Sequence, residues 1–116
     1  MNLNEYQSKI IPFDTFDKEQ WDGDLTKPAF MEKVLGLAGE AGEVEDKFKK
    51  ILRDNGAKLT PEAKEGIIKE LGDTLWYLAT IARYLDVTLD DLARGNIDKL
   101  QSRLDRNKLS GSGDNR

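Results

Sequence analysis

Apolar side chains recur at helical spacing over two long stretches of the chain. Within residues 28–53 the row comprises Phe30, Val34, Leu37, Ala38, Ala41, Val44, Phe48, Ile51 and Leu52. Within residues 61–85 it comprises Ile67, Leu71, Leu75, Leu78, Ala82 and Leu85. Because residues three and four apart share one face of a helix, each row predicts a long amphipathic helix whose apolar face lies in the core.

Proline, threonine and turn-forming residues predict where these two helices begin and end. Pro28 suits the first turn of the first helix, and Thr60 followed by Pro61 suits the start of the second. The Asp-Asn-Gly cluster at residues 54–56 predicts a loop between them.

The remaining segments are shorter or irregular. Thr88 lies three residues before Asp91, which resembles a capping box and predicts a helix over residues 88–105. A short amphipathic segment at residues 4–11 precedes an irregular stretch at residues 12–27. No stretch shows the period-two alternation that is typical of strands.

These elements predict an all-α fold, an antiparallel bundle of about four helices. We expect one helical domain at residues 1–107 and a Gly/Ser-rich tail at residues 108–116. A chain of 116 residues buries little surface as a monomer, so we expect dimerisation to complete the bundle.

The composition and charge of the chain limit its possible location and partners. Apolar residues make up 38% and charged residues 34% of the chain, and no apolar run is long enough to span a membrane. The first residues lack a basic segment followed by an apolar one, so we expect no signal peptide and a cytoplasmic location. A net charge of -4 disfavours a nucleic-acid partner held by a broad basic surface.

The chain has no cysteine and no histidine. Disulfides, thiolate metal sites and a serine-histidine-aspartate relay are therefore excluded, as is a di-iron bundle built on Glu-x-x-His pairs. What remains is oxygen chemistry, with carboxylates as ligands for hard cations such as Mg²⁺ or Mn²⁺.

Each long helix carries an acidic pair beside its apolar row. Glu40 and Glu43 share one face of the first helix, and Lys47 and Lys50 continue that row. On the second helix the corresponding row contains Glu70, Asp73 and Tyr77.

Two interpretations of these rows are open. Charged rows are commonly solvated helix faces, and then the protein would be a non-catalytic helical dimer that serves as an interaction module. The glycines beside the acids favour a site, because they allow another backbone or a ligand to approach closely; they are Gly36, Gly39, Gly42 and Gly72. If the rows face each other, four carboxylates converge, and such a group requires divalent cations.

The segments "GLAGEAGEVEDKFKK" and "KELGDTLWYLATIARYLDVTLDDL" combine these features. Glu-x-x-Glu followed by Glu-x-x-Asp on the next helix resembles the MazG-like branch of the all-alpha nucleoside triphosphate pyrophosphohydrolases, over roughly residues 31–107. The resemblance implies a magnesium-dependent enzyme that releases pyrophosphate and a monophosphate from (deoxy)nucleoside triphosphates, with a role in sanitising the nucleotide pool. It also implies a homodimer or homotetramer with the site partly at a subunit interface.

The resemblance also implies roles for single residues. Glu40, Glu43, Glu70 and Asp73 match the metal ligands, and either Glu40 or Glu43 would accept the proton of the attacking water. Residues expected to contact the substrate are Lys47, Lys50, Tyr77, Asn96, Lys99, Arg103, Lys108 and Arg116. The last two belong to the tail, whose glycines can present N–H groups to a phosphate in the same subunit or a neighbouring one.

Overall fold

The computed structural model describes residues 1–16 and 22–113, and these residues form four α-helices and no strand. The helices are α1 (Leu3–Lys9), α2 (Pro28–Asp54), α3 (Pro61–Tyr84) and α4 (Leu89–Asp105), and a short 3-10 helix, Ile11–Phe13, follows α1. The all-α class is therefore confirmed. Within the described residues no helix is both long and apolar enough to cross a bilayer.

The predicted helix boundaries agree with the structure to within a few residues. Pro28 opens α2, and the side-chain oxygen of Thr60 accepts a hydrogen bond from the N–H of Ala63 at the start of α3. The hydroxyl of Thr88 likewise accepts from the N–H of Asp91 and caps α4. These contacts satisfy backbone donors that the first turn of a helix leaves unpaired.

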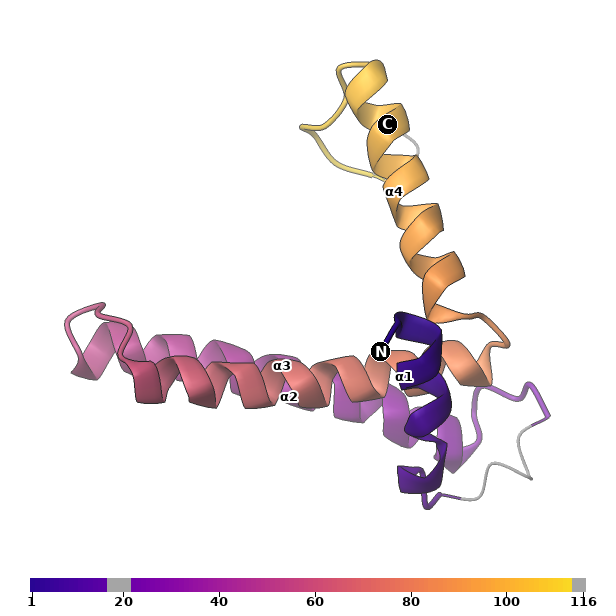
Figure 1. Ribbon diagram of the computed structural model, residues 1–116, viewed down its shortest axis with the longest axis horizontal. Coiled ribbons are helices and arrows are strands. Elements are labelled where there is room, and N and C mark those ends of the chain that lie inside the picture. Colours follow the sequence, from indigo (N-terminus) through magenta and orange to yellow (C-terminus); the bar gives the residue numbers. More distant parts are fainter. Residues whose placement is uncertain (17–21, 114–116) are drawn as a thin grey trace.

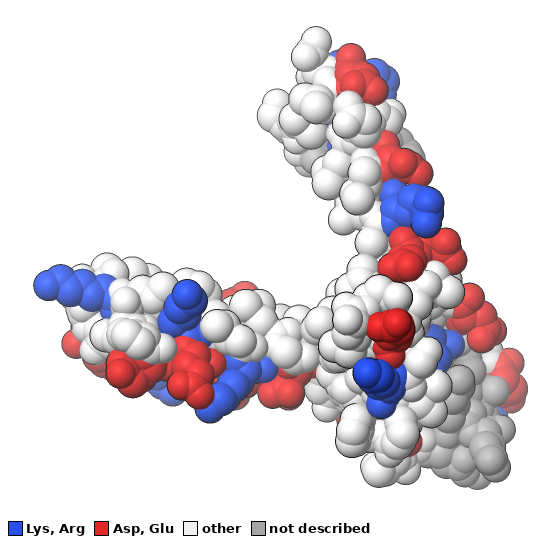
Figure 2. Space-filling view, in the orientation of Figure 1, with Lys and Arg blue, Asp and Glu red and all other residues white. Residues whose placement is uncertain are grey.

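The helices α2 and α3 lie side by side along most of their length as an antiparallel hairpin (Figure 1). The helix α4 instead leaves the end of α3 and points away from the hairpin (Figure 1). One chain therefore has two parts, the α2/α3 hairpin and α4, which meet at an elbow at residues 85–88. Among the described helices only α2 and α3 pack along most of their length. Charges of both signs are interspersed on the surface, while the side of α4 that faces the open angle is largely uncharged (Figure 2).

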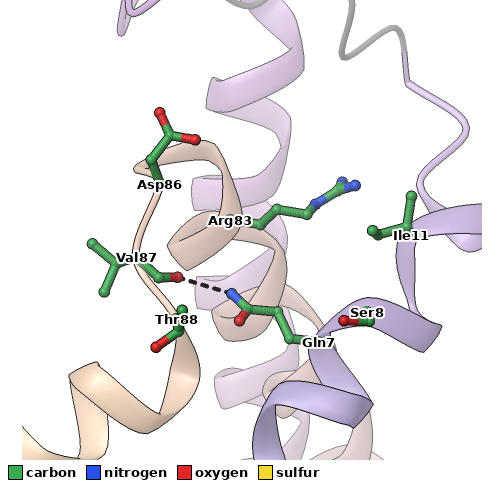
Figure 3. A pocket seen from close by; sticks show the side chains of 7 residues that line it. All are labelled: Gln7, Ser8, Ile11, Arg83, Asp86, Val87 and Thr88. Carbon is green, nitrogen blue, oxygen red and sulfur yellow. Dashed lines mark hydrogen bonds between the residues drawn. The ribbon is translucent and has the colours of Figure 1, made fainter.

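The helix α1 braces the elbow between α3 and α4. The side-chain amide of Gln7 donates to the carbonyl oxygens of Val87 at 3.0 Å and Ala79 at 3.3 Å. Its oxygen accepts from the N–H of Leu89 at 3.1 Å. Figure 3 shows Gln7 reaching from α1 to the turn, at the wall of a pocket of about 220 Å³. Because these bonds join both sides of the turn, Gln7 fixes the direction in which α4 leaves α3.

The buried core is concentrated near this elbow. One cluster comprises Ile10, Ala79, Ala82 and Leu89, and a second comprises Ala29, Phe30 and Tyr84. Farther along the described hairpin, the buried apolar residues are Ile51 and Ile67.

The prediction that both apolar rows are buried throughout is wrong for the single chain. The exposed members are Val34, Ala38, Ala41, Phe48, Leu52, Leu71, Leu75 and Leu85. Two helices cover each other along one stripe only, and the predicted rows are wider than that stripe. The outer part of each row therefore stays open to solvent, as at Leu52, which is 67% exposed.

The described part of the tail turns back along α4 (Figure 1). The N–H of Lys108 donates to the carbonyl oxygen of Arg103, and the Arg103 guanidinium donates to the carbonyl oxygen of Gly113 at 3.2 Å. Gly111 and Gly113 adopt positive φ angles of 107° and 88°, which glycine tolerates without strain.

Candidate metal centre

Three carboxylates converge between the two hairpin helices. Glu40 on α2 and the pair Glu70 and Asp73 on α3 each offer one oxygen, and these oxygens lie within 4.8 Å of one another. The spacing of three residues places Glu70 and Asp73 on the same side of α3, and the antiparallel register brings Glu40 opposite them.

The register is set by contacts on either side of the cluster. The ammonium of Lys47 lies 2.9 Å from the carboxylate of Glu70, and Tyr77 packs on Gly36 one turn away. A Cβ atom at Gly36 would lie 2.1 Å from Cε1 of the Tyr77 ring, so only glycine accommodates this contact. Of the glycines beside the acids, Gly36 alone is required by a described neighbour, since an added Cβ at Gly39, Gly42 or Gly72 would meet none within 4 Å.

The cluster is electrostatically unfavourable as it stands. Burial raises the pKa of the Glu40 carboxyl, and the charges of Asp73, Glu70 and Glu43 raise it further. Burial and neighbouring negative charge both disfavour the ionised form of this carboxyl. Hard oxygen ligands are the donors that Mg²⁺ and Mn²⁺ prefer, so the residues present fit a divalent cation.

The fourth predicted ligand, Glu43, lies outside this group of three. It is exposed on α2, one turn beyond Glu40, and acts on Glu40 through its charge. Its role as a metal ligand stays a prediction.

The predicted substrate contacts divide into two sets. On the hairpin, Tyr77 and Lys47 lie beside the cluster, while Lys50 is one turn farther on, with its ammonium 2.6 Å from Asp46. Lys47 and Lys50 also line a pocket of about 250 Å³ between α2 and α3.

The second set lies on α4 or follows it. Asn96, Lys99 and Arg103 are on α4, and Lys108 follows it, so a single chain does not bring them to the carboxylates (Figure 1). Arg116 lies outside the described residues.

A further group of polar residues, which the sequence did not predict, lies towards the start of α2. Glu32 and Lys33 precede Glu40 on α2, Asp14 follows the 3-10 helix, and Tyr6 comes from α1. The pKa of Tyr6 is raised by burial and by the charge of Asp73. Lys33 could have been noticed from its position on the apolar face, three residues after Phe30.

The fold and this site define an all-α protein with a cluster of three carboxylates on a helical hairpin, whose oxygens suit a hard cation. The family model of the MazG nucleotide pyrophosphohydrolase domain, which describes its sequences, matches residues 31–106. The chain therefore belongs to this family. The Gene 37 protein of Mycobacterium phage L5 is 51% identical over 83 residues, which cover 72% of this chain and 73% of that protein. No solved structure matches the chain significantly.

Proposed function

We propose that the protein hydrolyses (deoxy)nucleoside triphosphates to the monophosphate and pyrophosphate with Mg²⁺, removing unwanted nucleotides from the cytoplasmic pool. The observation that carries the proposal is the convergence of Glu40, Glu70 and Asp73 on the hairpin that matches the MazG family. We expect no membrane or nucleic-acid partner, and Mn²⁺ can substitute.

In this mechanism Glu40, Glu70 and Asp73, together with Glu43, would hold the cation. A bound cation would supply positive charge to the phosphate oxygens and would make the attacking water more acidic. Glu40 or Glu43 accepts the proton of the attacking water at a carboxylate oxygen. The Tyr77 hydroxyl contacts the nucleotide beside the carboxylates, and Lys47 and Lys50 bind phosphate oxygens from α2.

We further propose that the active form is a homodimer or homotetramer, in which α4 of a neighbouring chain completes the site. The exposed apolar rows of the hairpin and the separation of α4 from the carboxylates support this arrangement. The neighbour would supply Asn96, Lys99 and Arg103, and its tail, residues 108–116, would add Lys108 and Arg116.

Mixing two inactive variants tests this assembly. Asp73→Asn removes a hairpin carboxylate, and Asn96→Ala alters α4. If the site is shared, mixed oligomers contain one intact site, and mixing restores part of the activity. A mixture as inactive as its components, or a fully active monomer by light scattering, would contradict the shared site.

The catalytic proposal is tested with a panel of ordinary and modified triphosphates in Mg²⁺, with products separated by chromatography. We expect monophosphate and pyrophosphate, and no turnover in a chelator. Release of orthophosphate with a diphosphate would overturn the proposal. An interaction module without catalysis remains the alternative, and it would show neither turnover nor a rise in melting temperature with Mg²⁺.

A further inference from the structure

A lysine is buried on α2 two turns before Glu40, outside the carboxylate cluster. The Lys33 side chain is 3% exposed, and its ammonium lies 3.1 Å from the carboxylate of Asp14 and contacts that of Glu32. The ring centroids of Phe16 and Trp76 each lie 5.5 Å from the same nitrogen. Burial alone would lower the pKa of Lys33, but the bonds and charges of Glu32 and Asp14 outweigh burial and raise it. Lys33 is therefore a fixed positive charge.

Asp14, the partner of Lys33, also pairs with a second cation. Its carboxylate is 1% exposed and also accepts from the guanidinium of Arg83 at 2.5 Å. Asp14 precedes α2 by a long stretch of chain, whereas Arg83 lies near the end of α3. The ion pairs thus join three separate segments around Lys33, and a buried group of this kind is costly to break.

Two contacts lead from Lys33 to Tyr77. The Trp76 ring, which Lys33 faces, meets the Tyr77 ring edge to face with centroids 4.8 Å apart. The carboxylate of Glu32, which Lys33 pairs with, also acts on Tyr77: burial raises the pKa of the Tyr77 hydroxyl, and the negative charge of Glu32 raises it further. Tyr77 in turn packs on Gly36, one turn from Glu40.

We propose that Lys33 is a positioning residue, which holds Glu32 and Trp76 against Tyr77 and thereby fixes the Tyr77 ring beside the carboxylate cluster. This inference rests on the proposed function in one respect, that Tyr77 contacts the nucleotide. A purely structural lysine would support the fold equally well, but its loss would not act through Tyr77.

The experiment uses three single substitutions in the full-length chain. Lys33→Met keeps a long unbranched side chain that can still contact the rings but removes the charge, and Asp14 still pairs with Arg83. Glu32→Gln cuts the link to Tyr77 at a side chain that is 40% exposed, so this variant should fold even if the first does not. Lys49→Met is the matched control, a lysine of α2 that is 63% exposed.

We expect Lys33→Met and Glu32→Gln to raise the KM for the triphosphate about three- to tenfold. This is the size of effect expected when one hydrogen bond, here between Tyr77 and the nucleotide, is lost. The value of kcat should stay within about twofold, because a contact present in both the bound and the transition state affects KM alone. Lys49→Met should behave as the parent.

A double-mutant cycle with Tyr77→Phe separates positioning from structural support. If Lys33 acts through Tyr77, neither Lys33→Met nor Glu32→Gln raises KM further in the Tyr77→Phe background. Additive effects, or a parental KM for Glu32→Gln, would overturn the inference.

A readout that needs no turnover keeps the two proposals distinguishable. The ¹³C-labelled Tyr77 ring signal, assigned with Tyr77→Phe, should shift in Lys33→Met and Glu32→Gln but not in Lys49→Met. An inactive parent with these shifts would refute the proposed function and leave the positioning role standing. Unchanged Tyr77 signals would refute the positioning role whatever the activity.

Discussion

The two ends of the α2/α3 hairpin use the same kinds of residues in different ways. The head comprises residues 1–16, 28–36 and 76–90, and the arm comprises residues 37–75. In the head, apolar clusters are buried and the ion pairs of Asp14 are almost fully enclosed. In the arm, Phe48 and Leu71 are each 50% exposed, and Asp46 pairs with Lys49 and Lys50 at the surface.

This difference shows where the single chain is self-sufficient. The head has α1 as a third layer, which covers the end of the hairpin, whereas the arm has two layers only. The candidate metal centre lies where the arm begins, at Glu40 and Asp73. A site there has a rigid support on one side and an uncovered helical surface on the other, which a substrate or a second chain can approach.

The largest expected effect is at the carboxylates between the two regions. Asp73→Asn removes a proposed metal ligand, and we expect the rate of hydrolysis to fall by more than about 100-fold. Substituting a residue that only hydrogen-bonds to a metal ligand already lowers metal affinity or activity by up to about that factor. The substitution also removes repulsion in the cluster, so the melting temperature in a chelator should be unchanged or higher. Glu65→Gln, which alters an exposed carboxylate on α3, is the control. Near-parental activity of Asp73→Asn would refute the site.

The second prediction contrasts two aspartates that each pair with two cations. Asp14→Asn leaves Lys33 and Arg83 buried without their partner and should lower the free energy of unfolding by about 3–5 kcal/mol. Asp46→Asn removes pairs whose lysines are exposed to solvent, and we expect a much smaller loss of stability. Urea unfolding of both variants measures the difference. Equal losses in the free energy of unfolding would mean that the ion pairs of the head stabilise the fold no more than those of the arm.

The third prediction compares two glycines of α2. Gly36→Ala forces a Cβ into the Tyr77 ring and should destabilise the fold by about 1–3 kcal/mol. Gly39→Ala meets no described neighbour and should stabilise the helix by about 0.5–1 kcal/mol. Thermal melts at low protein concentration make the comparison. A destabilised Gly39→Ala variant would reveal that another chain or a ligand approaches this position.

The smallest effect concerns pH. The hydrogen bonds from Lys49 and Lys50 lower the pKa of Asp46 from 3.8 to about 2. Because the pKa is lower in the folded state, this group contributes stability above about pH 4 and loses the contribution as the pH falls towards 2. The parent should therefore lose slightly more stability than Asp46→Asn between pH 4.5 and pH 2.5. High salt should remove the difference, since the pairs are exposed.

The elements of the fold and the core of the site could be predicted because their signals are local. Pro28, Thr60 and Thr88 mark helix starts through their own backbone chemistry, and the acids of each row share a face by spacing alone. The antiparallel hairpin then brings Glu40 opposite Asp73. Family resemblance added the substrate class, which spacing does not contain.

What the sequence did not predict depends on contacts between distant segments. Periodicity shows which face of a helix is apolar but not how much of it a neighbour covers, so Leu52 and Leu71 were wrongly placed in a core. Lys33 was missed because its burial requires Asp14 and Glu32 at the right distance. Nothing in a local pattern fixes the direction of α4.

The bonds of Gln7 also bear on the order in which the chain folds. They close loops of 72 to 82 residues, whereas the α2/α3 hairpin is joined by a short connection. Since distant contacts form late, we expect the hairpin to assemble first, with α1 docking and α4 becoming oriented in one final step. In pulsed hydrogen exchange during refolding, the amide of Leu89 should gain protection after those of α3. Earlier protection at Leu89 would show that the elbow forms without α1.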